Sequence, residues 1–306
     1  FAIGSWRIEV SPQMLMLSYL LFAAGLAVKG DRVRQIATRP TIVLAGLAAN
    51  LTVPLAYLLL VIIPAVATWH NSEEGGTIIA GLALVSAMPV AGSSTGWARS
   101  AGGDMALSLG LVLASTLLSP LTTPFCLRLI VAASPTGHAA DLGRLARHDA
   151  GTFLTLWVLL PSMLGLLARR ILGGARAEAI ERVLKPLGPL VLLVLCYSGA
   201  AACLPRVLHA PDWDFLGLTL AFVIGLCTLT FGCGLLIGRI LKADRDQRAA
   251  LTFALGMNNN GTGLVLASLA LASRPTAVLP LIVYNLAQHV AAGIAGAWLR
   301  RSGPQS

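Results

Sequence analysis

Three observations predict an all-α integral membrane protein built from inverted repeats. Of the 306 residues, 56% are hydrophobic and 11% are charged, against about 25% charged residues in a soluble domain. The apolar residues gather in runs of about 20, the length of a helix that crosses a bilayer. Two of these runs, in different halves of the chain, are interrupted near their middle by glycine, proline and clustered polar residues.

Nine apolar runs predict nine spanning helices. They cover residues 13–28, 40–64, 77–99, 105–132, 151–168, 187–204, 215–238, 249–272 and 277–299. Residues 1–12 are too short and too polar for a signal peptide or a span, and the chain begins at Phe1 rather than Met, so we expect native sequence before it. The stretch at 139–150 is either a short amphipathic helix on the membrane surface or an ordinary polar loop.

The basic residues predict the orientation of these helices. Sixteen of the 22 Lys and Arg fall on the connections at one side, and this side is cytoplasmic by the positive-inside rule. The acidic connections at 70–76 and 210–215 then lie outside, and the C-terminus is cytoplasmic. We therefore expect a multi-pass protein of the inner (plasma) membrane. The net charge of +9 reflects this topology, so we expect the lipid bilayer, and no nucleic acid, as a partner.

Enzyme chemistry is not expected from this sequence. It shows no clustered acid, base and nucleophile and no spacing typical of metal ligands. The five cysteines lie in apolar runs without a CxxC motif, which favours a packing role over a disulfide framework or metal site. We expect no cofactor.

Both interrupted runs point to a binding site at the membrane midplane. In the run 77–99, Pro89 is followed by glycine and hydroxyl residues at 92–95, and in the run 249–272 glycines surround the asparagines at 258–260. A simple kink would explain either break alone. Irregular backbone at membrane depth is tolerated where it is buried in protein or lines a cavity, and paired breaks are typical of inverted-repeat transporters.

The positions of the breaks divide the chain into two repeats. The first repeat is 1–132 and the second is 151–306. The second break lies in the penultimate helix of a set of five, whereas the first lies in the penultimate helix of a set of four. We therefore expect a tenth helix before residue 1, and an odd repeat of five places the two halves in opposite orientations.

The residues around both breaks resemble the bile acid:sodium symporter family, as a divergent bacterial-type member. The stretch PVAGSSTGWARSAGGDMALSLGLVLASTLLSPLTTP at 89–124 is similar to the family pattern PGGxxSN…AxG[ND]xALS…STL…PLxTP. ALTFALGMNNNGTG at 250–263 resembles the ExGMQN segment, and FAAGLAVKGDRV at 22–33 the G[LM]xL segment. The resemblance covers nearly the whole chain. It implies ten helices in two inverted repeats, with panel and core domains interleaved between the repeats and the broken helices crossed in the core.

The resemblance also implies roles for individual residues. The family Ser-Asn pair falls on Ser94 and Thr95, and its Gln-Asn pair falls on Asn258 and Asn259. Asn285, Gln288 and His289 share one face of the last helix, near the substrate cavity of the family. Hydrogen bonding between helices is the alternative for these amides. The expected substrate-binding residues are Gly92, Ser93, Thr95, Asn258, Asn259, Asn260, Asn285, Gln288 and His289. The expected ion-binding residues are Asn50, Ser94, Thr95, Ser108 and Asn258.

Three departures from the family weaken the expected sodium sites. A Glu that serves both sites falls on Ala254, a Thr ligand falls on Val112, and the Asn of the Ser-Asn pair is Thr95. A carboxylate about 4 Å from an ion contributes about 4 kcal/mol at an effective dielectric near 20, roughly a thousandfold in affinity. Sodium is the one metal that the resemblance implies, and the family's two-sodium coupling is in doubt here.

The sequence therefore favours a secondary transporter of a small organic anion that works by alternating access. The alternative is an uncoupled uniporter or a transporter-like binding or sensor protein.

Overall fold

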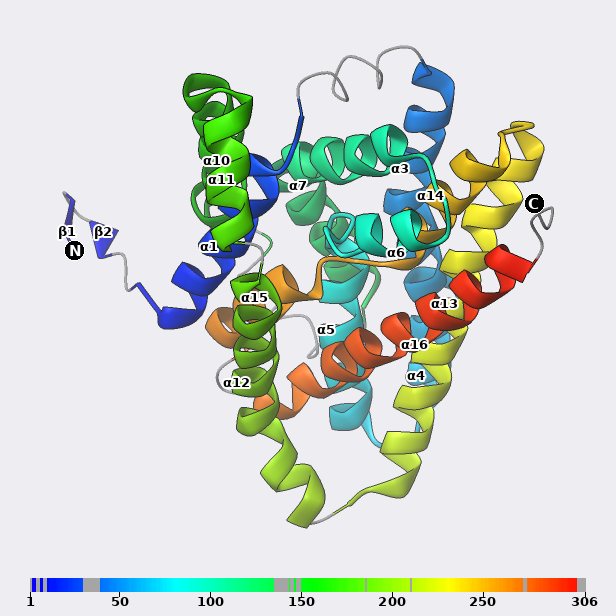
Figure 1. The fold of residues 1–306 in the computed structure, drawn as a ribbon. Helices are drawn as coiled ribbons and strands as arrows, with labels where there is room; N and C mark the ends of the chain where they lie inside the picture. The colour runs from blue at the N-terminus through cyan, green and yellow to red at the C-terminus, as the bar shows by residue number, and fades with distance from the viewer. Residues whose placement is uncertain are drawn as a thin grey trace.

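The computed structural model describes residues 2–3, 6–7, 10–29, 39–134, 143, 146, 150–184, 186–209, 211–271 and 274–301. The described chain is helical apart from short connections and a hairpin of β1 (Ala2–Ile3) and β2 (Trp6–Arg7) beside the helical body (Figure 1). The predicted surface helix at 139–150 falls largely outside the described residues.

The helices of the two halves follow in chain order. The first half contains α1 (Pro12–Leu26), α3 (Pro40–Tyr57), the π-helical turn η1 (Leu58–Ile62), α4 (Ile63–Ala67), α5 (Ser72–Ala87), α6 (Ser94–Ser100) and α7 (Met105–Ala133). The second half contains α9 (Ala150–Phe153), the π-helical turn η3 (Leu154–Leu159), α10 (Leu160–Leu172), α11 (Gly174–Leu184), α12 (Leu187–His209), α13 (Trp213–Ile240), α14 (Arg245–Gly256), α15 (Asn260–Ala270), the 3₁₀ turn η4 (Pro275–Val278) and α16 (Leu279–Arg301).

These helices confirm the predicted all-α membrane architecture. Within the described residues, six helical segments are long and apolar enough to cross a membrane. They are Pro40–Ala67, Met105–Ala133, Ala150–Leu172, Leu187–Pro205, Trp213–Ile240 and Pro275–Arg301. The other three predicted runs correspond to the shorter apolar helix α1 and to two broken pairs, α5 with α6 and α14 with α15.

The predicted ends of several helices are wrong because polar caps extend the helices beyond their apolar runs. The side chain of Asn71 accepts from the N–H groups of Glu73 and Glu74, so α5 begins at Ser72 rather than Thr77. A capping box of Asp244 and Gln247 starts α14 in the same way. The basic stretch that contains α11 was interpreted only as a cytoplasmic connection, and its helix was missed.

Two helices of the broken pairs, α5 and α14, are enclosed by other helices, and α5 lies at the centre of the helical body (Figure 1). Every residue of α5 from Gly75 to Ala87 is buried, as is every residue of α14 from Ala249 to Gly256. A helix that is buried on all sides must be enclosed by other elements, whereas an amphipathic helix packs with one face. The long helices α3, α7, α10, α12 and α13 instead expose many leucine side chains, as lipid contact requires.

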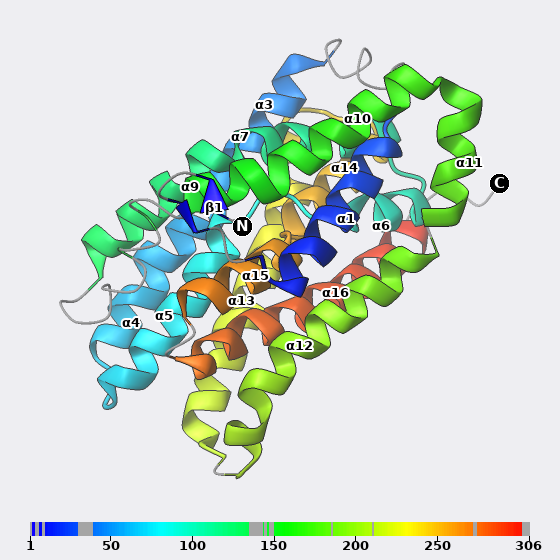
Figure 2. The ribbon, with the colours of Figure 1, turned by 90° about the vertical axis from the view of Figure 1, so that its left-hand side faces the viewer.

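Helices α1 and α10 pack side by side with their backbones in close contact (Figure 2). A Cβ atom at Gly25 would lie 2.1 Å from the Ser162 carbonyl oxygen, and one at Gly165 would lie 2.2 Å from the Phe22 carbonyl oxygen. Both positions therefore exclude any side chain. Small residues at such crossings let membrane helices gain dispersion contacts that larger side chains prevent.

We expect Gly165→Ala to separate α1 from α10 and to destabilise the protein by about 3 kcal/mol, the upper range for overpacking. Thermal unfolding of the purified protein in detergent measures this loss. Gly217→Ala is the matched control, because a Cβ atom at Gly217 on α13 meets nothing within 4 Å. Equal stability of the two variants would contradict the close contact.

Candidate functional site

The two helix interruptions pair with each other. Helices α5 and α14 both stop inside the molecule, and α6 and α15 continue them after short extended connections, which run antiparallel and form a single bridge. The N–H of Ala91 donates to the Met257 carbonyl at 2.8 Å, and the N–H of Asn259 donates to the Pro89 carbonyl at 2.8 Å. The breaks therefore form a crossing of two chain segments, residues 88–93 and 257–259. Each segment supplies hydrogen bonds to backbone groups of the other.

Hydroxyl groups of α7 bind the remaining free backbone groups at the crossing. Pro89 lacks an N–H and restricts the residue before it, so α5 ends here. The N–H of Val90 donates to Ser115 Oγ at 3.1 Å, and Thr123 Oγ1 donates to the Ala87 carbonyl at 2.6 Å. Neither Ser115 nor Thr123 was predicted as a site residue. Their spacing of eight residues, two turns of one helix face, was the signal available.

Asn258 forms hydrogen bonds from the crossing to three helices, α3, α5 and α16. Its side chain is fully buried. Its Nδ2 donates to the Val85 carbonyl at 2.9 Å, and its Oδ1 accepts from Asn50 Nδ2 at 3.3 Å. Its backbone N–H donates to Gln288 Oε1 at 3.1 Å. Asn258 was predicted to bind substrate and ion, but in this structure its amide group is occupied by protein partners.

The next two asparagines have different surroundings. Asn259 caps α15, because its Oδ1 accepts from the N–H of Thr262 at 3.2 Å. The Asn260 side chain is 2% exposed, and neither its Oδ1 nor its Nδ2 has a hydrogen-bond partner among the described residues. Buried polar groups are usually hydrogen-bonded, so an unpaired buried amide requires an explanation such as a ligand.

A cavity of about 300 Å³ lies against the crossing. All nine predicted substrate-binding residues line it: Gly92, Ser93, Thr95, Asn258, Asn259, Asn260, Asn285, Gln288 and His289. The opposite wall is apolar and comes mainly from α1 and α7, and includes Leu17, Leu21 and Leu113. The cavity thus has one polar side made by the crossing and α16, and one apolar side.

The three polar residues predicted to share one face of α16 are linked by hydrogen bonds. Gln288 Nε2 donates to Asn285 Oδ1 at 3.2 Å, and Asn285 Nδ2 donates to the Cys196 sulfur at 3.4 Å. His289 Nδ1 lies 2.7 Å from the Asn285 carbonyl oxygen. Among the described residues that line the cavity, His289 alone carries a titratable side chain, and none is Lys, Arg, Asp or Glu.

The predicted ion-binding residues are spread over different surroundings. Asn50, Ser94 and Ser108 are buried but do not line the cavity, and the hydroxyls of Ser94 and Ser108 have no partner among the described residues. Thr95 lines the cavity, and its hydroxyl donates to the Gly92 carbonyl at 2.8 Å. These placements leave the ion-binding roles as predictions.

Ala254 lies where the resemblance places the family carboxylate. It is fully buried in an apolar cluster that contains Val90, Leu107, Leu111 and Leu251, with Val112 packed against it. An isolated carboxylate is strongly disfavoured in such surroundings. Ala254 and Val112, two positions that differ from the family pattern, therefore lie in the same apolar cluster.

We expect Asn258→Ala to lower the stability by about 3 kcal/mol, because it removes a buried hydrogen bond to the Val85 carbonyl and leaves the buried Asn50 amide without its partner. Asn260→Ala is the matched control. It removes an amide of the same size that makes no hydrogen bond, so we expect a change within about 1 kcal/mol. Unfolding by denaturant in detergent compares the two, and equal losses would contradict their separate roles.

Comparisons with known proteins identify relatives of the chain. A sequence profile of the Sodium Bile acid symporter family matches residues 14–204, more than half of the chain. Uncharacterized protein YbaS of Bacillus subtilis is 26% identical over 94% of this chain and 88% of its own length. Uncharacterized sodium-dependent transporter YocS of Bacillus subtilis is 24% identical over 89% of this chain and 78% of its own length.

Proposed function

Because this chain belongs to the sodium bile acid symporter family, we propose that it is a secondary transporter that moves a small organic anion by alternating access. The chain is a multi-pass membrane protein, and we propose that it lies in the inner membrane with its C-terminus in the cytoplasm. The single observation that carries the proposal is the cavity at the crossing, which Asn260 lines and beside which its amide is buried without a described partner.

The polar side of the cavity suits an anion although no described lining residue is Lys or Arg. Helix α15 begins at Asn260, and both Asn260 and Gly261 line the cavity, so its positive end faces the bound molecule. Asn260 Nδ2 can add a hydrogen bond to a carboxylate oxygen. The leucines of α1 and α7 would then contact the apolar body of the substrate. A volume of about 300 Å³ lies at the small end of ligand sites, in keeping with a small substrate.

The proposed movement occurs between two groups of helices. Helices α1, α10 and α12 lie together on the left in Figure 1, and we assign them to the panel domain. The broken pairs, α3, α7, α13 and α16 form the core domain. The cavity is lined from both groups, by Leu17, Ser162 and Leu192 on the panel and by the crossing on the core. Sliding of the core against the panel would expose this cavity to each side in turn.

Uptake into proteoliposomes tests the proposal. The purified protein is supplied with radiolabelled carboxylates and steroid conjugates under sodium, proton or no gradient. We expect saturable uptake of at least one anion, and a loss of about tenfold or more in Asn260→Ala, since a buried hydrogen bond to a charged group contributes about 1.5–3 kcal/mol. Thr122→Ala, a hydroxyl on α7 outside the cavity lining, should transport normally. Absence of flux for every anion under every gradient would overturn the proposal.

An uncoupled uniporter, or a transporter-like binding or sensor protein, is the second candidate. The observation that favours it is the apolar cluster around Ala254, which leaves no described carboxylate at the position where the family binds sodium. In this case sodium would change neither the affinity for ligand nor the thermal stability.

If the second candidate is correct, sodium leaves the melting temperature of the wild type unchanged and raises that of the double variant Ala254→Glu/Val112→Thr, because the variant restores a carboxylate and a hydroxyl ligand. The single variant Ala254→Glu controls for the cost of a buried charge, and potassium controls for ionic strength. Strong sodium dependence of the wild type would show that the neutral ligands suffice and that our interpretation of Ala254 is wrong.

A further inference from the structure

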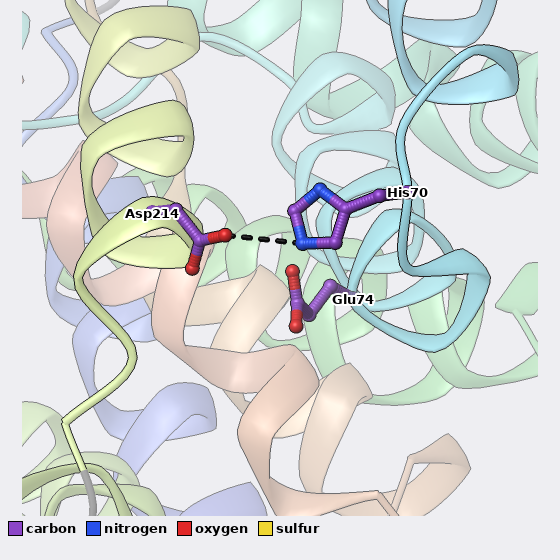
Figure 3. A group of neighbouring side chains, drawn as sticks. All are labelled: His70, Glu74 and Asp214. Carbon is purple, nitrogen blue, oxygen red and sulfur yellow. Dashed lines mark ion pairs between the residues drawn. The ribbon is translucent and has the colours of Figure 1, made fainter.

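Three side chains of metal-ligating types meet at the surface, outside the cavity (Figure 3). They are His70, Glu74 and Asp214. His70 lies on the connection between α4 and α5, Glu74 in the first turn of α5, and Asp214 in the first turn of α13. Within the part of the chain that the structure describes, this is the one group of three or more such side chains close enough to share a metal ion. The fold alone brings these two distant segments together.

The distances in this cluster suit a shared ion. His70 Nε2 lies 3.1 Å from Asp214 Oδ2, and one ligand atom from each of the three residues lies within 4.8 Å of the other two. Ligands about 2.0–2.2 Å from a tetrahedral zinc ion are about 3.4 Å apart. The pair His70 and Asp214 is already near this spacing. His70 and Asp214 are half or more exposed, so their side chains can rotate toward a shared ion with little resistance from packing.

Neighbouring side chains orient the Glu74 carboxylate. Trp69 Nε1 donates to Glu74 Oε2 at 2.9 Å, and Asn71 Nδ2 donates to Glu74 Oε1. Asn71 is itself fixed, because its Oδ1 caps α5. Metal-binding carboxylates commonly accept such outer hydrogen bonds, which hold them in position, and each oxygen keeps a lone pair for a cation. The Trp69 ring also lies against the His70 ring, with centroids 4.6 Å apart.

The charges of the cluster favour a cation over the ion pair alone. Two carboxylates face a single imidazole, and His70 Nε2 approaches Asp214 while Glu74 interacts only with neutral donors among the described residues. A divalent ion would bind both carboxylates at once. One imidazole with two carboxylates suits zinc and neighbouring first-row metals, whereas magnesium and calcium prefer ligand sets made of oxygen alone.

We propose that His70, Glu74 and Asp214 bind a first-row divalent metal ion such as Zn²⁺, with water in the remaining positions, and so join the α4–α5 connection to the start of α13. This site is separate from the transport cavity and does not depend on the proposed function. On the predicted orientation it faces the outside of the cell, where it would meet metal ions of the surroundings.

Equilibrium dialysis of the tag-free, full-length protein with Zn²⁺ tests the site. We expect one equivalent to bind, and each of His70→Asn, Glu74→Gln and Asp214→Asn to weaken binding by about tenfold or more, as loss of even an outer-shell partner does. Trp69→Phe removes one outer hydrogen bond and should give a smaller loss. His209→Asn and Glu73→Gln are matched controls, because they alter an exposed histidine and an exposed carboxylate outside the cluster; both should bind as the wild type does.

A spectroscopic readout separates ligand loss from loss of structure. Co²⁺ bound by one imidazole and two carboxylates should give a visible absorption band that is absent in His70→Asn. The metal-free variants should melt within a few degrees of the wild type, since all three residues lie at the surface. Absence of binding to the wild type, or equal Zn²⁺ binding by the wild type and His70→Asn, would overturn the proposal.

Discussion

The antiparallel pairing of the two broken helices is the interaction on which the rest of the structure depends. A chain that leaves the helical state inside a membrane must find other partners for its backbone groups. Ala91 and Asn259 donate across the crossing, and Ser115 and Thr123 of α7 satisfy the groups that Pro89 releases. With the backbone satisfied in this way, the start of α15 lies inside the molecule, where Asn260 and Gly261 line the cavity.

Hydropathy was sufficient to predict the helical architecture, because each span must be apolar along its full length. The paired interruptions could be predicted because both carry glycines and polar residues at matching positions of the two halves, and the resemblance implied that the broken helices cross. The separate surroundings of Asn258, Asn259 and Asn260 could not be predicted. They depend on which carbonyl or amide lies opposite each side chain, and Val85, Asn50 and Thr262 are close only in the folded chain. The early start of α5 was missed for a related reason, since a cap such as Asn71 acts outside the apolar run.

Ala254 stands where the resemblance places a carboxylate, and its surroundings are apolar as well. A lost carboxylate alone could leave a polar pocket that water or an ion still occupies. Here the neighbouring Val90, Leu107 and Leu111 close the space with apolar contacts. The polar groups that remain, Ser94 and Ser108, are buried on other helices without a described partner. Where the resemblance places a carboxylate, this chain therefore has hydrophobic packing beside the crossing.

The backbone contact between α1 and α10 has a mechanical consequence. Side chains that interdigitate can adjust by changing rotamers, but Gly25 and Gly165 offer no side chain that could move. The two helices are therefore held at a fixed separation where they touch, and Leu17 and Leu21 of α1 line the cavity beside this contact. Leucine side chains make no directional bonds, so a movement of this helix pair against the crossing would break few hydrogen bonds.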